Sequence, residues 1–243
     1  MKKVVIVTGS QRGIGRATII EFASRGYDVV IDYIEEEERA LELKELVERE
    51  YGVQALAIKA DVREEAHVDR MVREVIGAFG QIDVLVNNAG IAIDKEFEDR
   101  TIKDFRDTIN TNLIGPYIVA KRVGEEMMKV KSGKIVNVSS TNGINAFFPT
   151  SLDYDASKAG LINLTHNLAL QFAPYINVNS VAPGWVDTEM NKDLPEDLIE
   201  EENAKIYLGR FAQPEEIAKV ICFLASEDAK YINSEIIKVD GGY

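Results

Sequence analysis

The chain has 243 residues, of which 46% are hydrophobic and 28% charged, and its formal net charge at pH 7 is −13. These proportions exclude a disordered or fibrous protein, and the length predicts a single domain spanning residues 1–243. The negative charge argues against nucleic acid or an anionic membrane as partner, because like charges repel, and it favours a small-molecule substrate.

The N-terminus briefly looks like an export signal, because two lysines precede an apolar run. The run covers only Val4–Val7 and is followed by Gly9, so it predicts a buried strand rather than a signal peptide. No stretch reaches the ~18–20 apolar residues of a membrane span. The single cysteine, Cys222, lies in an apolar run and is expected to be buried. We therefore expect a cytoplasmic protein.

Short β-branched runs alternate with longer helical patterns, as in successive βαβ units. Strand runs that are almost entirely apolar indicate burial on both faces, as in a parallel sheet covered by helices. We predict an α/β fold, a Rossmann-type doubly wound parallel sheet of about seven strands with helices on both faces. The expected strands are 4–7, 29–31, 55–58, 84–86, 135–138, 178–182 and 236–239; the expected helices are 14–24, 36–50, 64–79, one after 86, 154–172 and 214–225.

Two acidic stretches interrupt this pattern. Residues 35–38 are all glutamate, and we interpret them as the solvated first turn of a helix, where negative charge suits the helix dipole. Residues 195–202 follow the sixth strand and predict a mobile surface helix. Because ligand-gating segments often lie in such excursions, we expect a substrate lid around 187–212.

The first strand leads directly into a glycine-rich segment, residues 8–15, and then into a helix. Glycines let the backbone turn tightly and approach a pyrophosphate, whose charge is attracted by free N–H groups at the helix start. The spacing of Gly9, Gly13 and Gly15 is Gly-x-x-x-Gly-x-Gly rather than Gly-x-Gly-x-x-Gly. Taken alone, this loop fits either a dinucleotide site or a structural turn.

Lys158 follows Tyr154 by four residues in a helical pattern, which places both side chains on one helix face. Reduction of a carbonyl leaves negative charge on its oxygen, so that chemistry needs a proton donor beside the oxygen. A tyrosine normally titrates near ~10, and a nearby cation lowers that pKa by roughly 1–3 units. The pair is suited to such proton transfer, although Tyr-x-x-x-Lys also occurs on many helices by chance.

With these motifs in order, the chain resembles the short-chain dehydrogenase/reductase family over essentially its whole length. The glycine spacing and the Tyr154–Lys158 segment are two of the landmarks. The others are Asp61-Val62 after the third strand, Asn87–Gly90 after the fourth, Asn112, Ser139-Ser140 after the fifth, residues 183–188 after the sixth, and the terminal Asp240-Gly241-Gly242.

The resemblance implies hydride transfer between a nicotinamide and a carbonyl or alcohol, with four catalytic residues. It makes Tyr154 the general acid or base. Lys158 would lower the pKa of Tyr154 and hold the nicotinamide ribose. Ser140 would bind the substrate oxygen, and Asn112 would help to hold a water in a proton relay.

The choice of serine depends on spacing. Ser140 precedes Gly143 by three residues, as in the family, which favours it over Ser139. The interval from Ser140 to Tyr154 is one residue longer than in many members, so Thr141 remains a rival.

The resemblance also implies a cofactor site. Tyr33 lies where NAD-preferring members carry an acid, and Arg12 is suited to a 2′-phosphate, so we predict a modest preference for NADP(H) over NAD(H). Asp32, one position earlier, and the run 35–38 argue the other way. The expected contacts are Gly9, Ser10, Gln11, Arg12, Gly13, Ile14, Gly15, Asp32, Tyr33, Asp61, Val62, Asn88, Ala89, Gly90, Tyr154, Lys158, Pro183, Gly184, Val186 and Thr188.

Within the family, the general layout is most similar to 3-oxoacyl-(acyl carrier protein) reductases, which implies a carbonyl substrate such as an acyl thioester. Lys131 occupies one of two basic places where such enzymes dock their acidic carrier, but the net charge of −13 opposes that partner. A sugar or polyol dehydrogenase stays open. So does a noncatalytic dinucleotide-binding sensor, against which the intact catalytic residues argue.

Assembly and metal binding complete the expectations. The resemblance implies a homotetramer or homodimer, and Leu161, Leu164 and Leu168 lie at helical spacing, facing either a partner or the core. His67 and His166 lack ligand spacing, so no metal site is expected. Trp185 fits either the substrate cleft or the core.

Overall fold

The computed structural model describes residues 2–243 and contains a sheet of seven strands, all paired in parallel, in the order β3-β2-β1-β4-β5-β6-β7. The predicted Rossmann-type architecture is confirmed, and every expected strand is present. Their bounds are β1 Val4–Val7, β2 Asp28–Tyr33, β3 Ala55–Lys59, β4 Val84–Asn87, β5 Gly133–Val138, β6 Ile176–Pro183 and β7 Ile236–Val239.

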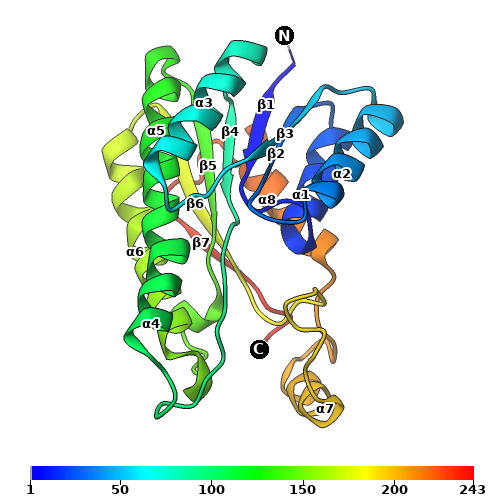
Figure 1. The fold of residues 1–243 in the computed structure, drawn as a ribbon, viewed down its shortest axis with the longest axis vertical. Coiled ribbons are helices and arrows are strands. Elements are labelled where there is room, and N and C mark those ends of the chain that lie inside the picture. The colour runs from blue at the N-terminus through cyan, green and yellow to red at the C-terminus, as the bar shows by residue number, and fades with distance from the viewer. Residues whose placement is uncertain (1) are drawn as a thin grey trace.

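Helices cover both faces of the sheet (Figure 1). Helices α1, α2 and α8 pack on one face, and α3, α5 and α6 on the other. Helix α7 lies apart, near the C-terminus (Figure 1). The bounds are α1 Gly13–Ser24, α2 Glu37–Tyr51, α3 Glu65–Phe79, α4 Ile102–Ile109, α5 Gly115–Val130, α6 Leu152–Phe172, α7 Glu196–Lys205 and α8 Pro214–Leu224, with a π-helix, η1, at Asn110–Ile114 and 3₁₀ turns η2 Thr141–Gly143, η3 Pro149–Ser151 and η4 Glu227–Ala229.

The central strand shows why the sheet needs helices on both sides. Successive side chains of a strand point to opposite faces. In β1, Val5 and Val7 belong to the core cluster beneath α1, α2 and α8, whereas Val4 and Ile6 belong to the cluster beneath α3, α5 and α6. All four side chains are buried, so both layers of helices are needed to keep β1 from water.

The order of the strands determines where a ligand can bind. The chain runs outward from β1 to β2 and β3, then crosses to β4 on the other side of β1. The loops that follow β1 and β4 therefore leave the sheet in opposite directions and open a crevice at its carboxyl edge. The glycine loop follows β1, and Asn88 follows β4.

The segment between β4 and α4 has no regular secondary structure and is held by a buried ion pair. The Arg100 guanidinium contacts the Asp153 carboxylate, with 5% and 0% of the two side chains exposed. Arg100 also donates to the carbonyls of Ile93 and Thr150. Asp153 accepts a hydrogen bond from Thr108 Oγ1 at 3.0 Å. The pair thus ties this segment and α4 to the first turn of α6.

One interpretation of surface residues needs correction. Helix α2 begins at Glu37, so residues 35 and 36 precede its first turn instead of forming it. Of the two environments left open for the leucines, Leu161 and Leu168 lie in the protein's own core. Glu202, at the end of the acidic stretch, is only 2% exposed and has internal hydrogen-bonding partners.

We predict that Arg100→Ala and Asp153→Ala each lower the free energy of unfolding by about 3–5 kcal/mol, because either change leaves a buried charge without its partner. Replacement of both residues by apolar ones, Arg100→Met with Asp153→Leu, should cost less than either single change. Urea unfolding measures all three. Lys103→Ala, which breaks the exposed pair with Asp107, is the matched control and should leave the midpoint unchanged. Equal shifts in the control and the single variants would contradict this account.

Candidate active site

The glycine loop is shaped by two residues in the left-handed region, Gly9 with φ +58° and Gly13 with φ +54°. A Cβ added at Gly9 would lie 2.9 Å from the Cα of Ala89, so a side chain there would collide with the segment after β4. The Gly9 N–H donates to the Asp32 carboxylate at 3.1 Å, and the Ser10 N–H to the Asp32 carbonyl at 2.8 Å. The loop is thus fixed against the ends of both β2 and β4.

Asn88 braces the same loop. Its side-chain amide donates to the carbonyls of Thr8 and Gly9, each at 2.9 Å. A Cβ on Gly15 would lie 2.6 Å from the Asn88 amide nitrogen, so only glycine leaves room for this contact. The structure therefore gives Asn88 a direct role in shaping the loop, in addition to its expected place beside the adenosine.

Unpaired polar groups around the loop fit a dinucleotide. The side-chain oxygens Ser10 Oγ, Gln11 Oε1 and Asp32 Oδ1 are buried without a hydrogen-bond partner. Helix α1 begins after Arg12, whose side chain makes no capping hydrogen bond, so the first N–H groups of α1 lack a side-chain acceptor. Buried polar atoms rarely remain unpaired, and a bound dinucleotide would supply the missing partners of Ser10 and Gln11.

The second and third strands carry the residues expected near the adenosine. Tyr33, at the end of β2, is buried in the core, and burial raises its pKa. Burial also raises the pKa of Asp32 to about 7. Asp61 follows β3 and forms an ion pair with Arg63 at 2.6 Å, and the hydrogen bond from Arg63 lowers the pKa of Asp61. Val62 is buried against Gly115.

The expected catalytic side chains come together at the carboxyl edge of β5. Tyr154 and Lys158 lie one turn apart on α6, and Lys158 Nζ is 5.4 Å from the centre of the Tyr154 ring. Lys158 Nζ donates to the carbonyl of Val138 at 2.8 Å. The Ser140 side chain lies close enough to Tyr154 to lower the pKa of the tyrosine. A carbonyl bound here would meet two hydroxyl groups from different elements of the fold.

The neighbours of Ser140 are engaged elsewhere. Ser139 Oγ donates to the Val181 carbonyl at 3.1 Å and accepts from Ser180 Oγ at 2.7 Å, inside the sheet. Thr141 is buried at the start of η2. This arrangement supports Ser140 over both rivals.

Burial disfavours the charged forms of both Tyr154 and Lys158. Burial raises the pKa of Tyr154 to about 12, and the hydrogen bond with Ser140 opposes that rise. Burial lowers the pKa of Lys158 to about 8.

Asn112 lies in the π-helix η1 and is fully buried. Its amide donates to the Ile91 carbonyl at 2.8 Å and to Ser157 Oγ at 3.1 Å, and its Oδ1 accepts from the Ile91 N–H at 2.9 Å. Pro116 stands four residues later and cannot donate the usual helical hydrogen bond to the Asn112 carbonyl. This proline is the signal in the sequence for the irregular helix, and such π turns often mark functional sites.

Two polar residues near Ser140 escaped the sequence analysis. Asn142 accepts from Ser140 Oγ at 3.2 Å, and its amide donates to Asp155 Oδ1 at 2.7 Å. Asp155 also accepts from Ser151 Oγ at 3.1 Å and from the Phe148 N–H at 3.3 Å. The loop that contains the extra residue is therefore fastened to the residue after Tyr154.

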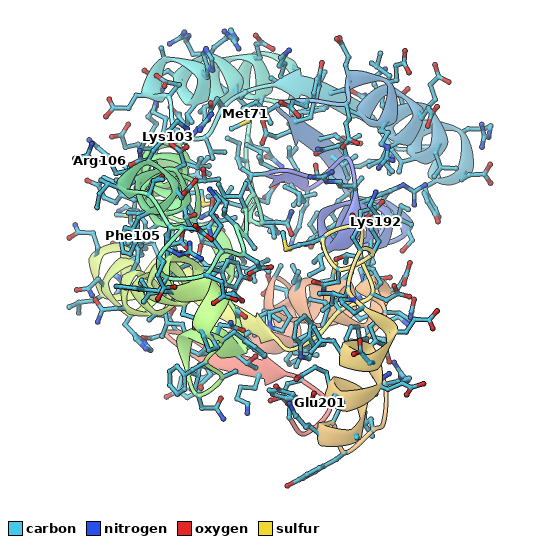
Figure 2. All side chains as sticks on the ribbon, turned by 60° about the horizontal axis from the view of Figure 1, so that its bottom comes forward. Met71, Lys103, Phe105, Arg106, Lys192 and Glu201 are labelled. Atoms are coloured by element: carbon cyan, nitrogen blue, oxygen red, sulfur yellow. The ribbon has the colours of Figure 1, made fainter. Side chains whose placement is uncertain are left out.

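The segment after β6 lies against the glycine loop. Thr188 is adjacent to Gly13, where an added Cβ would lie 3.6 Å from its methyl carbon. Lys192 lies beside the start of α1 (Figure 2). Val186 is buried and forms a single parallel bridge with Ala212. The remaining predicted residues Ile14, Gly90, Pro183 and Gly184 lie at this same edge of the sheet, with Gly184 packed on Asp240 and Gly90 near both Asn112 and Lys158.

Trp185 joins that segment to the loop near Ser140. Its ring stacks on Phe211 with centroids 5.3 Å apart and meets Phe148 edge-on at 5.4 Å. Its indole N–H donates to the buried Glu202 carboxylate at 2.8 Å, which also accepts from the Tyr243 hydroxyl. Burial would raise the pKa of Glu202, but the hydrogen bonds from Lys205, Tyr243 and Trp185 outweigh this effect and lower the pKa.

A glycine loop that faces the Tyr154 helix across one edge of a Rossmann-type sheet is the layout of a nicotinamide-dependent oxidoreductase. The chain belongs to the short-chain dehydrogenase/reductase family: the family model described as "Enoyl-(Acyl carrier protein) reductase" matches residues 9–243. It is an NAD(P)-dependent oxidoreductase that acts on a CH–OH or keto group.

Two curated relatives are similar over nearly the full chain. A 3-oxoacyl-[acyl-carrier-protein] reductase of Aquifex aeolicus is 40% identical over 241 residues, covering 99% of this chain and 96% of the relative. The enzyme of the same name from Staphylococcus aureus is 39% identical over 243 residues, covering 100% and 98%. The crystal structure of levodione reductase matches with a TM-score of 0.93 at 32% identity, covering 99% of this chain and 96% of that one.

Among residues 2–243, no helix has both the length and the apolar character needed to cross a bilayer. Within the same residues, no group of three or more His, Cys, Asp or Glu side chains is arranged to hold a metal ion.

The lowered pKa of Lys158 predicts a pH-dependent stability. Between about pH 8 and the usual value of 10.5, the unfolded chain binds the Lys158 proton more tightly than the folded chain does, so the free energy of unfolding rises with pH in that window. Below about pH 8, the folded protein bears the full cost of burying the charged Lys158 ammonium. Relative to Lys158→Met, the wild type should gain on the order of 3 kcal/mol across the window in urea titrations. Parallel pH curves for the two proteins would contradict the shift.

Proposed function

We propose that the protein interconverts 3-oxoacyl and 3-hydroxyacyl thioesters. The observation that carries the proposal is the meeting of the Tyr154 and Ser140 hydroxyls next to Lys158, on the side of the sheet where the glycine loop opens. The substrate class comes from the two curated relatives, both named 3-oxoacyl-[acyl-carrier-protein] reductase. The assays below compare this substrate class with the sugars and polyols that other members of the family oxidise.

The proposed mechanism assigns one task to each side chain. The bound dinucleotide supplies or accepts the hydride. Tyr154 donates its hydroxyl proton to the substrate oxygen during reduction and takes it back during oxidation. Ser140 holds that oxygen by a hydrogen bond, so the oxygen lies within reach of the Tyr154 proton. Lys158 provides positive charge that favours the tyrosinate, and Asn112 helps to hold a water in a proton relay.

The proposed cofactor site uses the groups that line the glycine loop. The N-terminal N–H groups of α1 bind the pyrophosphate, and Lys158 binds the nicotinamide ribose. We propose a modest preference for NADP(H). Tyr33 presents no acid, and the Asp32 carboxylate is buried on the Gly9 N–H instead of being presented to a ribose. Arg12, with about half of its side chain exposed, is the cation offered to a 2′-phosphate.

Further proposals concern the whole molecule. Residues 1–243 form a single domain in which residues around 187–212 act as a substrate lid, supported by the contact of Thr188 with the glycine loop. The protein acts in the cytoplasm as a homotetramer or homodimer, without nucleic-acid or membrane partners. An acyl carrier protein is disfavoured by the net charge of −13, whereas a small thioester meets less repulsion.

Tyr154→Phe tests the proposed acid. The change removes one oxygen and keeps the ring, so kcat should fall by roughly 10²–10⁴-fold while the Kd for the dinucleotide stays within twofold. Steady-state kinetics and fluorescence titration of the reduced cofactor measure the two quantities. Full activity in the variant would refute the mechanism, and loss of cofactor binding would indicate a structural effect instead.

A substrate panel tests the proposed class. Acetoacetyl thioesters should give a kcat/KM at least tenfold above that of any sugar or polyol, and NADPH should give the lower KM of the two reduced cofactors. Turnover confined to polyols would establish the competing enzymatic activity. Absence of turnover with the acetoacetyl thioesters would contradict the proposed substrate class.

A further inference from the structure

Two segments near the proposed catalytic hydroxyls are joined by a pair of aromatic rings. Strands β5 and β6 pair in parallel, so the chain leaves both at the same edge of the sheet, side by side. Phe148 belongs to the loop after β5, and Trp185 belongs to the segment after β6. Their ring centroids are 5.4 Å apart, and the planes are inclined by 73°. This pair, here called the aromatic bridge, closes the space between the two segments.

The aromatic bridge is fastened next to Tyr154. The Phe148 N–H donates to the Asp155 carboxylate at 3.3 Å, and Asp155 directly follows Tyr154 in α6. In the sheet, β5 separates β6 from β4 and β1, whose loops form the crevice for the cofactor. A carbonyl held by Ser140 and Tyr154 at the end of β5 therefore has the crevice on one side and the aromatic bridge on the other.

Trp185 is held on its other side as well. Its ring stacks on Phe211, with centroids 5.3 Å apart and planes inclined by 9°. Its indole N–H donates to the Glu202 carboxylate at 2.8 Å, and only 2% of the Glu202 side chain is exposed. Turning the indole away would remove one donor from a buried carboxylate, which is costly. The aromatic bridge is therefore a rigid wall that a ligand does not easily displace.

The surface of this wall is apolar. Both rings of the aromatic bridge remain partly exposed, so a ligand bound beside them can touch them. The indole N–H is the one hydrogen-bond donor that the two side chains possess, and Glu202 already accepts it. A sugar hydroxyl facing the wall would lose its hydrogen bonds to water without gaining new ones, whereas a hydrocarbon chain would gain apolar contact. The wall therefore fits the alkyl end of a substrate.

We propose that Phe148 and Trp185 limit the length of the acyl chain that this enzyme reduces, by stopping the alkyl end of the substrate. The inference rests on the proposed function, which puts the 3-oxo group of a thioester at Ser140 and Tyr154. The alkyl end lies against the rings, which leaves the polar thioester end directed away from them. A short chain fits between the carbonyl and the wall. Each further methylene must displace a ring that is held in place, so the enzyme favours short 3-oxoacyl chains.

A series of thioesters tests the proposal. The acetoacetyl, 3-oxohexanoyl and 3-oxooctanoyl esters of N-acetylcysteamine would be assayed with the wild type, Phe148→Ala, Trp185→Ala and the matched control Phe147→Ala. For the wild type, kcat/KM should fall at least about tenfold from the shortest ester to the longest, because methylenes that do not fit are penalised by that much. Phe148→Ala and Trp185→Ala should each raise the ratio of longest to shortest about tenfold. The control, whose residue is 76% exposed, should leave the ratio unchanged.

The ratio separates specificity from damage to the fold, because a poorly folded variant loses activity on all three esters alike. Phe148→Ala removes no hydrogen bond, since those of Phe148 come from its backbone, so this variant decides the matter if Trp185→Ala does not fold. Equal kcat/KM for all three esters in the wild type, or an unchanged ratio in Phe148→Ala, would overturn the inference and leave the proposed function standing. Absence of turnover on every ester in the wild type would overturn both together.

Discussion

The reversal of strand order between β1 and β4 is the constraint on which the rest of the molecule depends. It forces two loops apart at the carboxyl edge of the sheet. Both loops lie beyond the paired strands, so backbone hydrogen bonds of the sheet do not hold them. The protein holds them with side chains: Asn88 fastens one loop to the other, and the buried Arg100 and Asp153 pair fastens the segment after β4 to α6. The position of Tyr154 therefore depends on contacts made by residues that never meet a substrate.

The strands were the most predictable part of the fold, because each contains a short apolar run, and β1, β2 and β4 are buried on both faces. Strands β1 and β7 begin and end where the sequence pattern places them, and the others are longer by a few residues at their ends, such as Asp28 in β2 and Ile176 in β6. The spacing of Tyr154 and Lys158 predicted their nearness for a similar reason, since one turn of helix determines it. Local periodicity was sufficient in both cases.

What the sequence could not provide were contacts between distant segments. Glu202 stands in a strongly acidic stretch and looks solvated, yet its partners Trp185 and Tyr243 are 17 and 41 positions away. Asp32 was weighed as a ribose ligand, but its carboxylate turns beneath Gly9. Glu36 adopts a left-handed backbone conformation, which a sequence normally indicates by a glycine, and no glycine stands there. In each case the side chain's environment depends on packing, which pattern and charge alone do not reveal.

The buried Glu202 carboxylate makes the segment after β6 behave as one piece. Trp185 before α7, Lys205 within it and Tyr243 beyond β7 all donate to the same side chain, so no part of the set can change independently. For protein engineering this defines the exchangeable module. A lid transplanted from a relative would have to bring its own counterparts of Trp185, Glu202 and Tyr243, since a helix grafted alone would leave either a buried charge or an indole without a partner.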